Sequence, residues 1–186
     1  MLTRPANPPR IRPVDWLRSA GSRGVLAVAI ACAVAGCGGS SAATSKAASV
    51  GPAFAARALS VCATAQRSKR AWSKLSAPGF NPKQPNVQQL PQVAAWLQEQ
   101  VAPTFDAWLH ELTALGEPPT GQAAWTQVLA LVAKIDDLNK TQVDAGQAGN
   151  ASAFADATNG LGQVQPQLIR ATNAAGVGRC ADVHAG

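Results

Sequence analysis

The chain has 186 residues, 47% of them hydrophobic, with one Met and no Tyr, which is enough for one modest domain and too few for several. Its formal net charge is +6, but five of its basic residues lie before an apolar run at residues 25–35: Arg4, Arg10, Arg12, Arg18 and Arg23. From Cys37 onward, 11 Lys and Arg stand against 9 Asp and Glu, so basicity gives no reason to expect a nucleic-acid partner.

The N-terminal stretch has the profile of a signal peptide, because an Arg-rich segment over residues 1–24 precedes the apolar run VLAVAIACAVA. A membrane-spanning helix needs about 20 apolar residues, so an uncleaved span is the weaker alternative for this short run. We therefore predict a cleaved lipoprotein signal peptide over residues 1–36.

Cys37 follows three residues of the lipobox type, one aliphatic and two small: Val34, Ala35 and Gly36. The segment behind it is rich in Gly, Ser and Ala, which predicts a flexible linker over residues 37–52. We expect diacylglyceryl and palmitate-type acyl groups on Cys37 to anchor the mature protein to the outer face of the bacterial cell membrane. An ordinary signal-peptide site with an incidental cysteine is one alternative, and acylation of Cys32, which fits the tetrad less well, is another.

Apolar residues then recur every three or four positions, which is the period of a helix with one buried face. The first such stretch ends at Ala77-Pro78-Gly79 and comprises Phe54, Ala58, Val61, Ala65, Trp72 and Leu75. Its opposite side carries Arg67, Arg70 and Lys74. The stretch is therefore predicted to be an amphipathic helix with a basic outer side.

A second helix is predicted from the apolar positions Val93, Leu97, Val101, Phe105, Trp108, Leu112 and Leu115. Pro103 lies within it and removes one backbone hydrogen bond, so we expect a kink or a break near Val101. Residues 116–119, Gly-Glu-Pro-Pro, end this helix.

Thr120 is a candidate N-cap for a third helix that continues until Gly146. Its buried face is predicted to comprise Trp125, Val128, Leu129, Val132, Ile135 and Leu138. A fourth helix is expected from about residue 150 to Gly176, and its continuity is open because of the helix-disfavouring residues Gly160, Gly162 and Pro166. No stretch has the alternation of a strand, so the predicted fold is all-α, an up-down-up-down four-helix bundle over residues 53–186.

Two cysteines remain once Cys32 leaves with the signal peptide and Cys37 is acylated, namely Cys62 and Cys180. An oxidising extracytoplasmic compartment favours a disulfide between them, with two free buried thiols as the alternative. In the predicted topology the fourth helix ends near the start of the first, so the tail after Gly176 brings Cys180 back to Cys62.

Three short motifs occur at matching places in this layout: VCATAQ around Cys62, LGEPP at residues 115–119 and VGRCAD around Cys180. Together they resemble uncharacterised lipoproteins of high-GC actinobacteria, over about residues 54–182. The resemblance implies a small helical bundle and an envelope location, and it implies no activity.

The sequence lacks the known catalytic and metal-binding patterns. It has no Glu-x-x-His pair for a di-iron bundle, no Cys-x-x-Cys-His haem motif, no Gly-x-Ser-x-Gly elbow and no Gly-rich phosphate loop. His110, beside Glu111, is interpreted as a surface residue near the end of a helix, and the other histidine is His184 in the tail. Asp136 and Asp137 alternate with Lys134 and Lys140, which predicts a solvated helix face. We expect no catalytic residue, no metal site and no cofactor.

Four tryptophans are spread over three predicted helices and are expected to fill the core: Trp72, Trp96, Trp108 and Trp125. The alternative is a Trp-lined pocket for a small apolar ligand, which would touch Trp108, Trp125 and Gly160. The basic side of the first helix is a candidate contact for an anionic envelope surface, since residues 46–98 contain seven basic residues and no acidic one.

The predicted function is that of a membrane-anchored extracytoplasmic lipoprotein, a non-enzymatic binding or scaffolding module of the cell envelope. One alternative is a carrier of the small apolar ligand described above. Another is an enzyme with a dispersed site. The sequence names no protein partner.

Overall fold

The computed structural model describes residues 48–75, 78 and 86–184, and the predicted signal peptide, lipobox and Cys37 lie outside them. The described part is all-helical, with no strand in it. Its helices are α1 (Pro52–Trp72), α2 (Leu90–Trp96), α3 (Ala102–Ala114), α4 (Gln122–Gln147) and α5 (Ala151–Ala175), with the shorter η1 (Val87–Gln89), η2 (Leu97–Val101) and η3 (Gly178–Val183). None of the helices in these ranges combines the length and hydropathy of a membrane-spanning segment.

The second predicted helix is present as α2, η2 and α3, which follow one another without a gap from residue 90 to residue 114. η2 is a single π-helical stretch, and Pro103 lies in the first turn of α3 directly after it. A proline has no backbone N–H, so one hydrogen bond of this helical run is missing at Pro103, and a π-helical turn directly precedes it. Of the predicted kink or break near Val101, the structure shows a local widening of the turn, and the helical run itself does not break there.

The start of α4 differs from the prediction, because its N-cap is Gly121 and not Thr120. Gly121 has a φ of +72°, and a Cβ there would lie 2.5 Å from the carbonyl oxygen of Ala48. The chain that leads into α1 thus passes directly over Gly121. The Thr120 hydroxyl donates to the carbonyl oxygen of Ser49 at 3.2 Å and helps to hold this crossing.

α5 is continuous from Ala151 to Ala175, although it contains two glycines and Pro166. The Asn150 side chain caps its first turn by accepting from the backbone N–H of Ala153. Pro166 and Gly162, four residues apart, are both exposed, so solvent is available to the Gly162 carbonyl that loses its donor. Gly176, with a φ of +78°, ends the helix as predicted.

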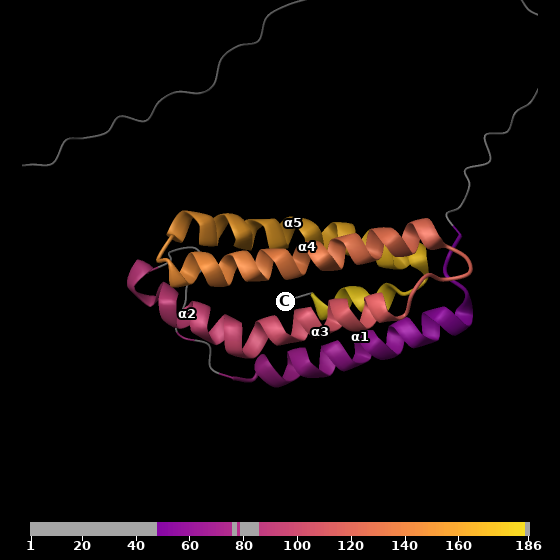
Figure 1. The fold of residues 1–186 in the computed structure, drawn as a ribbon, viewed down its shortest axis with the longest axis horizontal. Helices are drawn as coiled ribbons and strands as arrows, with labels where there is room; N and C mark the ends of the chain where they lie inside the picture. The colour runs from indigo at the N-terminus through magenta and orange to yellow at the C-terminus, as the bar shows by residue number, and fades with distance from the viewer. Residues whose placement is uncertain (1–47, 76–77, 79–85, 185–186) are drawn as a thin grey trace, which may run out of the picture. The chain divides into compact units, whose positions relative to one another are not determined.

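The packing of α1 against α5 passes through η3 (Figure 1). α1 contacts α3 and η3, and α5 contacts α4 and η3, while α4 also packs on α2 and α3. The largest fully buried side chains come from four of these helices and are Trp108, Trp125, Phe154, Leu90, Leu112 and Ile135. Each stabilises the fold by about 1.5–3 kcal/mol through its removal from water, so the tryptophans of α3 and α4 fill the core as predicted.

The packed unit begins at Val50, earlier than residue 53. Val50 is only 5% exposed, and its backbone N–H donates to the carbonyl oxygen of Ala175 at 3.1 Å. The end of α5 therefore lies beside the start of α1, as the predicted topology requires. The linker, predicted to reach residue 52, ends before Val50.

Gly146 does not close α4, which continues to Gln147. Instead it lets α2 approach α4, since a Cβ at this position would lie 2.7 Å from the Cβ of Ala94 and 3.2 Å from the carbonyl oxygen of Leu90. Real Cβ atoms do not approach so closely, so any side chain here forces the two helices apart. The glycine is needed for packing rather than for a turn.

Gly146→Ala is accordingly expected to lower the free energy of unfolding by about 1–3 kcal/mol, because the new methyl group overlaps α2. Gly162→Ala is the matched control, since a Cβ there meets nothing within 4 Å and alanine favours a helix by about 1 kcal/mol. Urea unfolding of both variants measures the difference. A Gly146→Ala protein as stable as Gly162→Ala would contradict the close packing of α2 on α4.

Candidate functional site

The predicted disulfide joins Cys62 of α1 to Cys180 of η3, so the alternative of two free thiols is wrong. Both residues are buried, at 1% and 0% exposure, and the Trp108 indole N–H donates to Cys62 Sγ at 3.4 Å. The bridge spans a sequence separation of 118 residues. In the chain-entropy model a loop of that length stabilises the fold by about 4–5 kcal/mol.

Two side chains of α1 hold the backbone of η3 on either side of the disulfide. The Gln66 amide donates to the carbonyl oxygen of Arg179 at 2.7 Å, and the Lys69 ammonium donates to that of Asp182 at 3.4 Å. Burial lowers the pKa of Lys69, and the nearby charge of Asp182 opposes this shift in part. α1 and η3 are therefore held together by the disulfide and these two hydrogen bonds, and they form two facing walls.

A cleft of about 340 Å³ lies between these walls, with Cys62 at its base. Gln66 and Arg70 line it from α1, and Arg179 and Asp182 line it from η3. A smaller hollow of about 150 Å³, lined by Lys69 together with three of these residues, adjoins it. We call the two together the α1–η3 cleft. Sequence reasoning missed Lys69, Gln66 and Arg179 as parts of a site, because they meet only when η3 folds back along α1.

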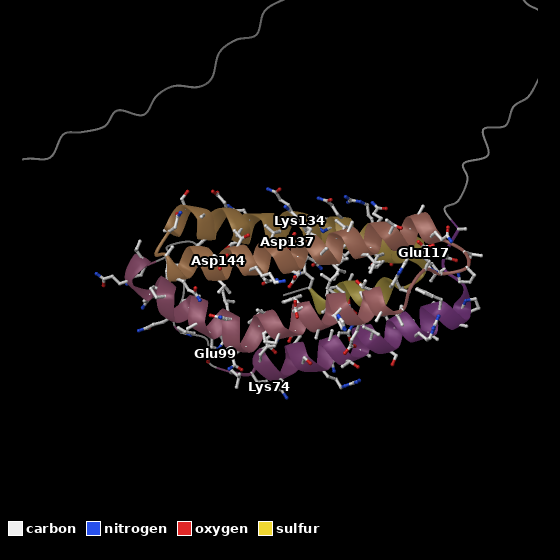
Figure 2. The ribbon with its side chains drawn as sticks, viewed as in Figure 1. Lys74, Glu99, Glu117, Lys134, Asp137 and Asp144 are labelled. Carbon is white, nitrogen blue, oxygen red and sulfur yellow. A yellow bond between two sulfur atoms is a disulfide. The ribbon has the colours of Figure 1, made fainter. Side chains whose placement is uncertain are left out.

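The predicted basic residues Arg67, Arg70 and Lys74 are all exposed. Arg67 donates to the hydroxyl of Thr64 at 2.9 Å, and Lys74 follows the last turn of α1, where Figure 2 shows it at the outer edge. Residues 48–75 contain five basic residues and no acidic one. Glu99 of η2 lies toward the same end of the molecule as Lys74 in Figure 2.

The opposite flank of α1 has a different character. A hollow of about 140 Å³ lies there between α1 and α3, and its polar lining includes Thr64, Ser68, Thr104 and Glu111. Trp108 also touches this hollow. Trp125 does not line it, because its ring packs edge-on against Phe54 with the centroids 4.9 Å apart.

The predicted Trp-lined ligand pocket also requires Gly160. A Cβ on Gly160 would lie 2.9 Å from a methyl carbon of Leu138, so that side chain fills the space beside it. The hollow that Trp108 lines includes neither Trp125 nor Gly160 among its lining residues.

The prediction of a solvated face around Asp136 is wrong for that residue, which is 3% exposed, while Asp137 is exposed as predicted. Lys140 pairs with Asp136 Oδ2 at 2.6 Å and reaches Asp106 at 3.4 Å. Its hydrogen bond to Asp136 raises the pKa of Lys140. The other oxygen of Asp136 is buried and has no partner among the described residues. One lysine at i+4 thus lets α4 bury a carboxylate.

The two histidines lie in different environments. His110 is exposed beside Glu111, as predicted. His184 is half-buried: its ring packs edge-on against Phe105, and Nε2 lies 3.0 Å from the carbonyl oxygen of Leu161. Burial is the main cause that lowers the pKa of His184, the hydrogen bond to Leu161 opposes it, and the charge of Lys69 adds to the lowering. Within the described ranges no three His, Cys, Asp or Glu residues gather as a metal site would require.

Comparison with known proteins found no matching family model, no similar curated protein and no similar solved structure. Within the described residues, the α1–η3 cleft combines three basic side chains, Lys69, Arg70 and Arg179, with the carboxylate of Asp182.

The lowered pKa of His184 predicts a loss of stability in acid. In the unfolded chain the imidazole titrates near pH 6.5, and in the folded protein it resists protonation. The contribution of neutral His184 to the free energy of unfolding is thus present above about pH 6.5. It is lost as the pH falls toward the lowered pKa of the folded protein. His184→Gln should flatten the decline in urea midpoint between about pH 8 and about pH 5, since glutamine keeps a donor and does not titrate. His110→Gln is the control, and an unchanged slope in His184→Gln would refute the assignment.

Proposed function

We propose that the protein is a membrane-anchored extracytoplasmic lipoprotein, a non-enzymatic binding or scaffolding module of the cell envelope. The observation that best supports it is the set of exposed basic residues on and just after α1, Arg67, Arg70 and Lys74, in a stretch that contains no acidic residue. The buried disulfide is also typical of an oxidising compartment outside the cytoplasm. We place the chain, on its motifs, among the actinobacterial lipoproteins that it resembles.

The proposal includes an up-down-up-down four-helix topology for the domain. In this description α2, η2 and α3 count as one bent helix, which is supported by their unbroken run over residues 90–114. The other three helices are α1, α4 and α5, and η3 is an added segment between α1 and α5. The packing of α1 on α3, α3 on α4 and α4 on α5 supports this order.

The proposed anchor is the acyl group on Cys37. Twelve residues separate Cys37 from Val50, where the packed unit begins. A Gly/Ser-like coil of that length has a root-mean-square span of about 19 Å, so the domain stays close to its membrane. Anionic headgroups attract each nearby Lys or Arg by about 1 kcal/mol. Three such residues orient a tethered domain but recruit a free one only weakly.

Cys37→Ala is expected to abolish labelling of the expressed protein by a fatty acid and to leave the precursor uncleaved, because the acceptor thiol is gone. The matched control is Cys32→Ala, which should be labelled and processed like the unchanged chain. Metabolic labelling followed by electrophoresis measures both effects. Normal labelling of Cys37→Ala would overturn the proposed anchor.

The orienting role of α1 predicts weak, salt-sensitive binding of the mature chain to vesicles that contain an anionic lipid. Arg67→Glu with Lys74→Glu should remove this binding, because it reverses two charges of the outer side. Lys134→Glu with Arg170→Glu makes the same change in net charge on α4 and α5, where both residues are exposed, and should retain most of it. Equal sedimentation of the two variants with vesicles would show that α1 has no special role.

A further inference from the structure

The two arginines of the α1–η3 cleft have unused hydrogen-bonding capacity. Arg70 on α1 and Arg179 on η3 both line the cleft, and within the described part of the chain neither guanidinium forms an ion pair or a hydrogen bond. An arginine carries a permanent charge and five donors in a planar fork, which matches the oxygens of a phosphate group in two-pronged contacts. Two such forks facing one cleft are suited to bind a single anion.

The walls that carry the two arginines are fixed before any ligand arrives. Cys180, next to Arg179, is covalently bound to Cys62, and the Arg179 carbonyl accepts a 2.7 Å hydrogen bond from Gln66. The separation of the two backbones is therefore set by a disulfide and a hydrogen bond. Ligand binding at such a site orders only the side chains, which reduces the entropic cost of binding.

The size and charge of the cleft also fit an anion. Its volume of about 340 Å³ far exceeds the ~10–15 Å³ that one water molecule needs in the same measure. Lys69, Arg70 and Arg179 contribute three positive charges against the single carboxylate of Asp182. The hollow on the α3 flank of the same helix has Glu111 and no basic residue in its lining. The lining of the α1–η3 cleft thus has an excess of basic over acidic side chains, and the lining of the hollow on the α3 flank does not.

We propose that the α1–η3 cleft is a binding site for a phosphate group, held between the guanidinium groups of Arg70 and Arg179. The phosphate belongs either to a soluble phosphate ester or to a lipid headgroup, since both present the same oxygens. The site exists only in the folded, disulfide-bonded protein, because Arg179 is 109 positions from Arg70 in the sequence. The site does not depend on acylation of Cys37, so it is expected even if the proposed lipid anchor is wrong.

The test titrates the mature chain of residues 37–186, with Cys37→Ser to keep it free of lipid, with glycerol 3-phosphate. Heteronuclear NMR is expected to record saturable shifts of the Arg70 and Arg179 side-chain N–H signals. Arg70→Gln with Arg179→Gln should weaken binding by about tenfold or more, because charge-assisted hydrogen bonds are lost. The control, Lys134→Gln with Arg170→Gln, removes the same net charge elsewhere and should bind like the unchanged chain.

A second variant separates geometry from charge. Arg70→Lys with Arg179→Lys keeps both charges and loses the planar forks, so it should still bind more weakly than the unchanged chain. All four side chains that are changed are exposed, and the melting temperature of each variant verifies that it folds. Equal affinity of the Gln cleft variant and its control would overturn the proposal, as would the absence of saturation.

Vesicles of phosphatidylcholine with phosphatidylglycerol identify the source of the phosphate. If a headgroup enters the cleft, excess glycerol 3-phosphate should displace the chain from the vesicles, and the Gln cleft variant should bind them less than its control does. If the natural ligand is a soluble ester, the chain still binds glycerol 3-phosphate in solution. Its vesicle binding is then unaffected by excess glycerol 3-phosphate and by the Gln substitutions in the cleft. Loss of vesicle binding in Arg67→Glu with Lys74→Glu, combined with intact binding in solution, assigns the two surfaces separate roles.

Discussion

The fold depends on the covalent attachment of η3 to α1. Without this segment α1 would lack its second neighbour, since the packing of α1 against α5 passes through η3. Cys180 and Val183 of η3 are fully buried. The segment therefore contributes side chains to the core in addition to its disulfide with α1. The disulfide restricts the unfolded chain and at the same time places the C-terminal tail in the one position where it completes the core.

The same attachment determines the electrostatics of α1. On its α3 flank the helix faces Glu111, and on its η3 flank it faces Arg179 and Asp182. The basic residues of α1 therefore belong to a surface whose character depends on the neighbouring element. The proposed phosphate site and the proposed membrane contact are adjacent on this helix, and both include Arg70.

α4 is the helix on which three others pack, and it combines close backbone approach with buried polar groups. Gly146 admits α2, and the Gln142 amide donates to the hydroxyl of Thr158 on α5 at 2.8 Å. Asn139 donates to the backbone carbonyl of Ile135 in its own helix at 2.9 Å. Because an unpaired polar group in the core costs about 1–3 kcal/mol, the Gln142–Thr158 bond favours one register of α4 on α5 over others.

The sequence by itself determined the helical segments, the irregular turn before Pro103 and the Cys62–Cys180 pair, because periodicity, proline chemistry and cysteine count act locally or by elimination. Tertiary structure decided the rest. Gly121 is the N-cap in place of Thr120, at the point where the chain leading into α1 crosses it, and Asp136 is buried with its charge paired by the exposed Lys140. The α1–η3 cleft was the feature least accessible to sequence analysis, because Arg70 and Arg179 come together only when η3 folds back along α1.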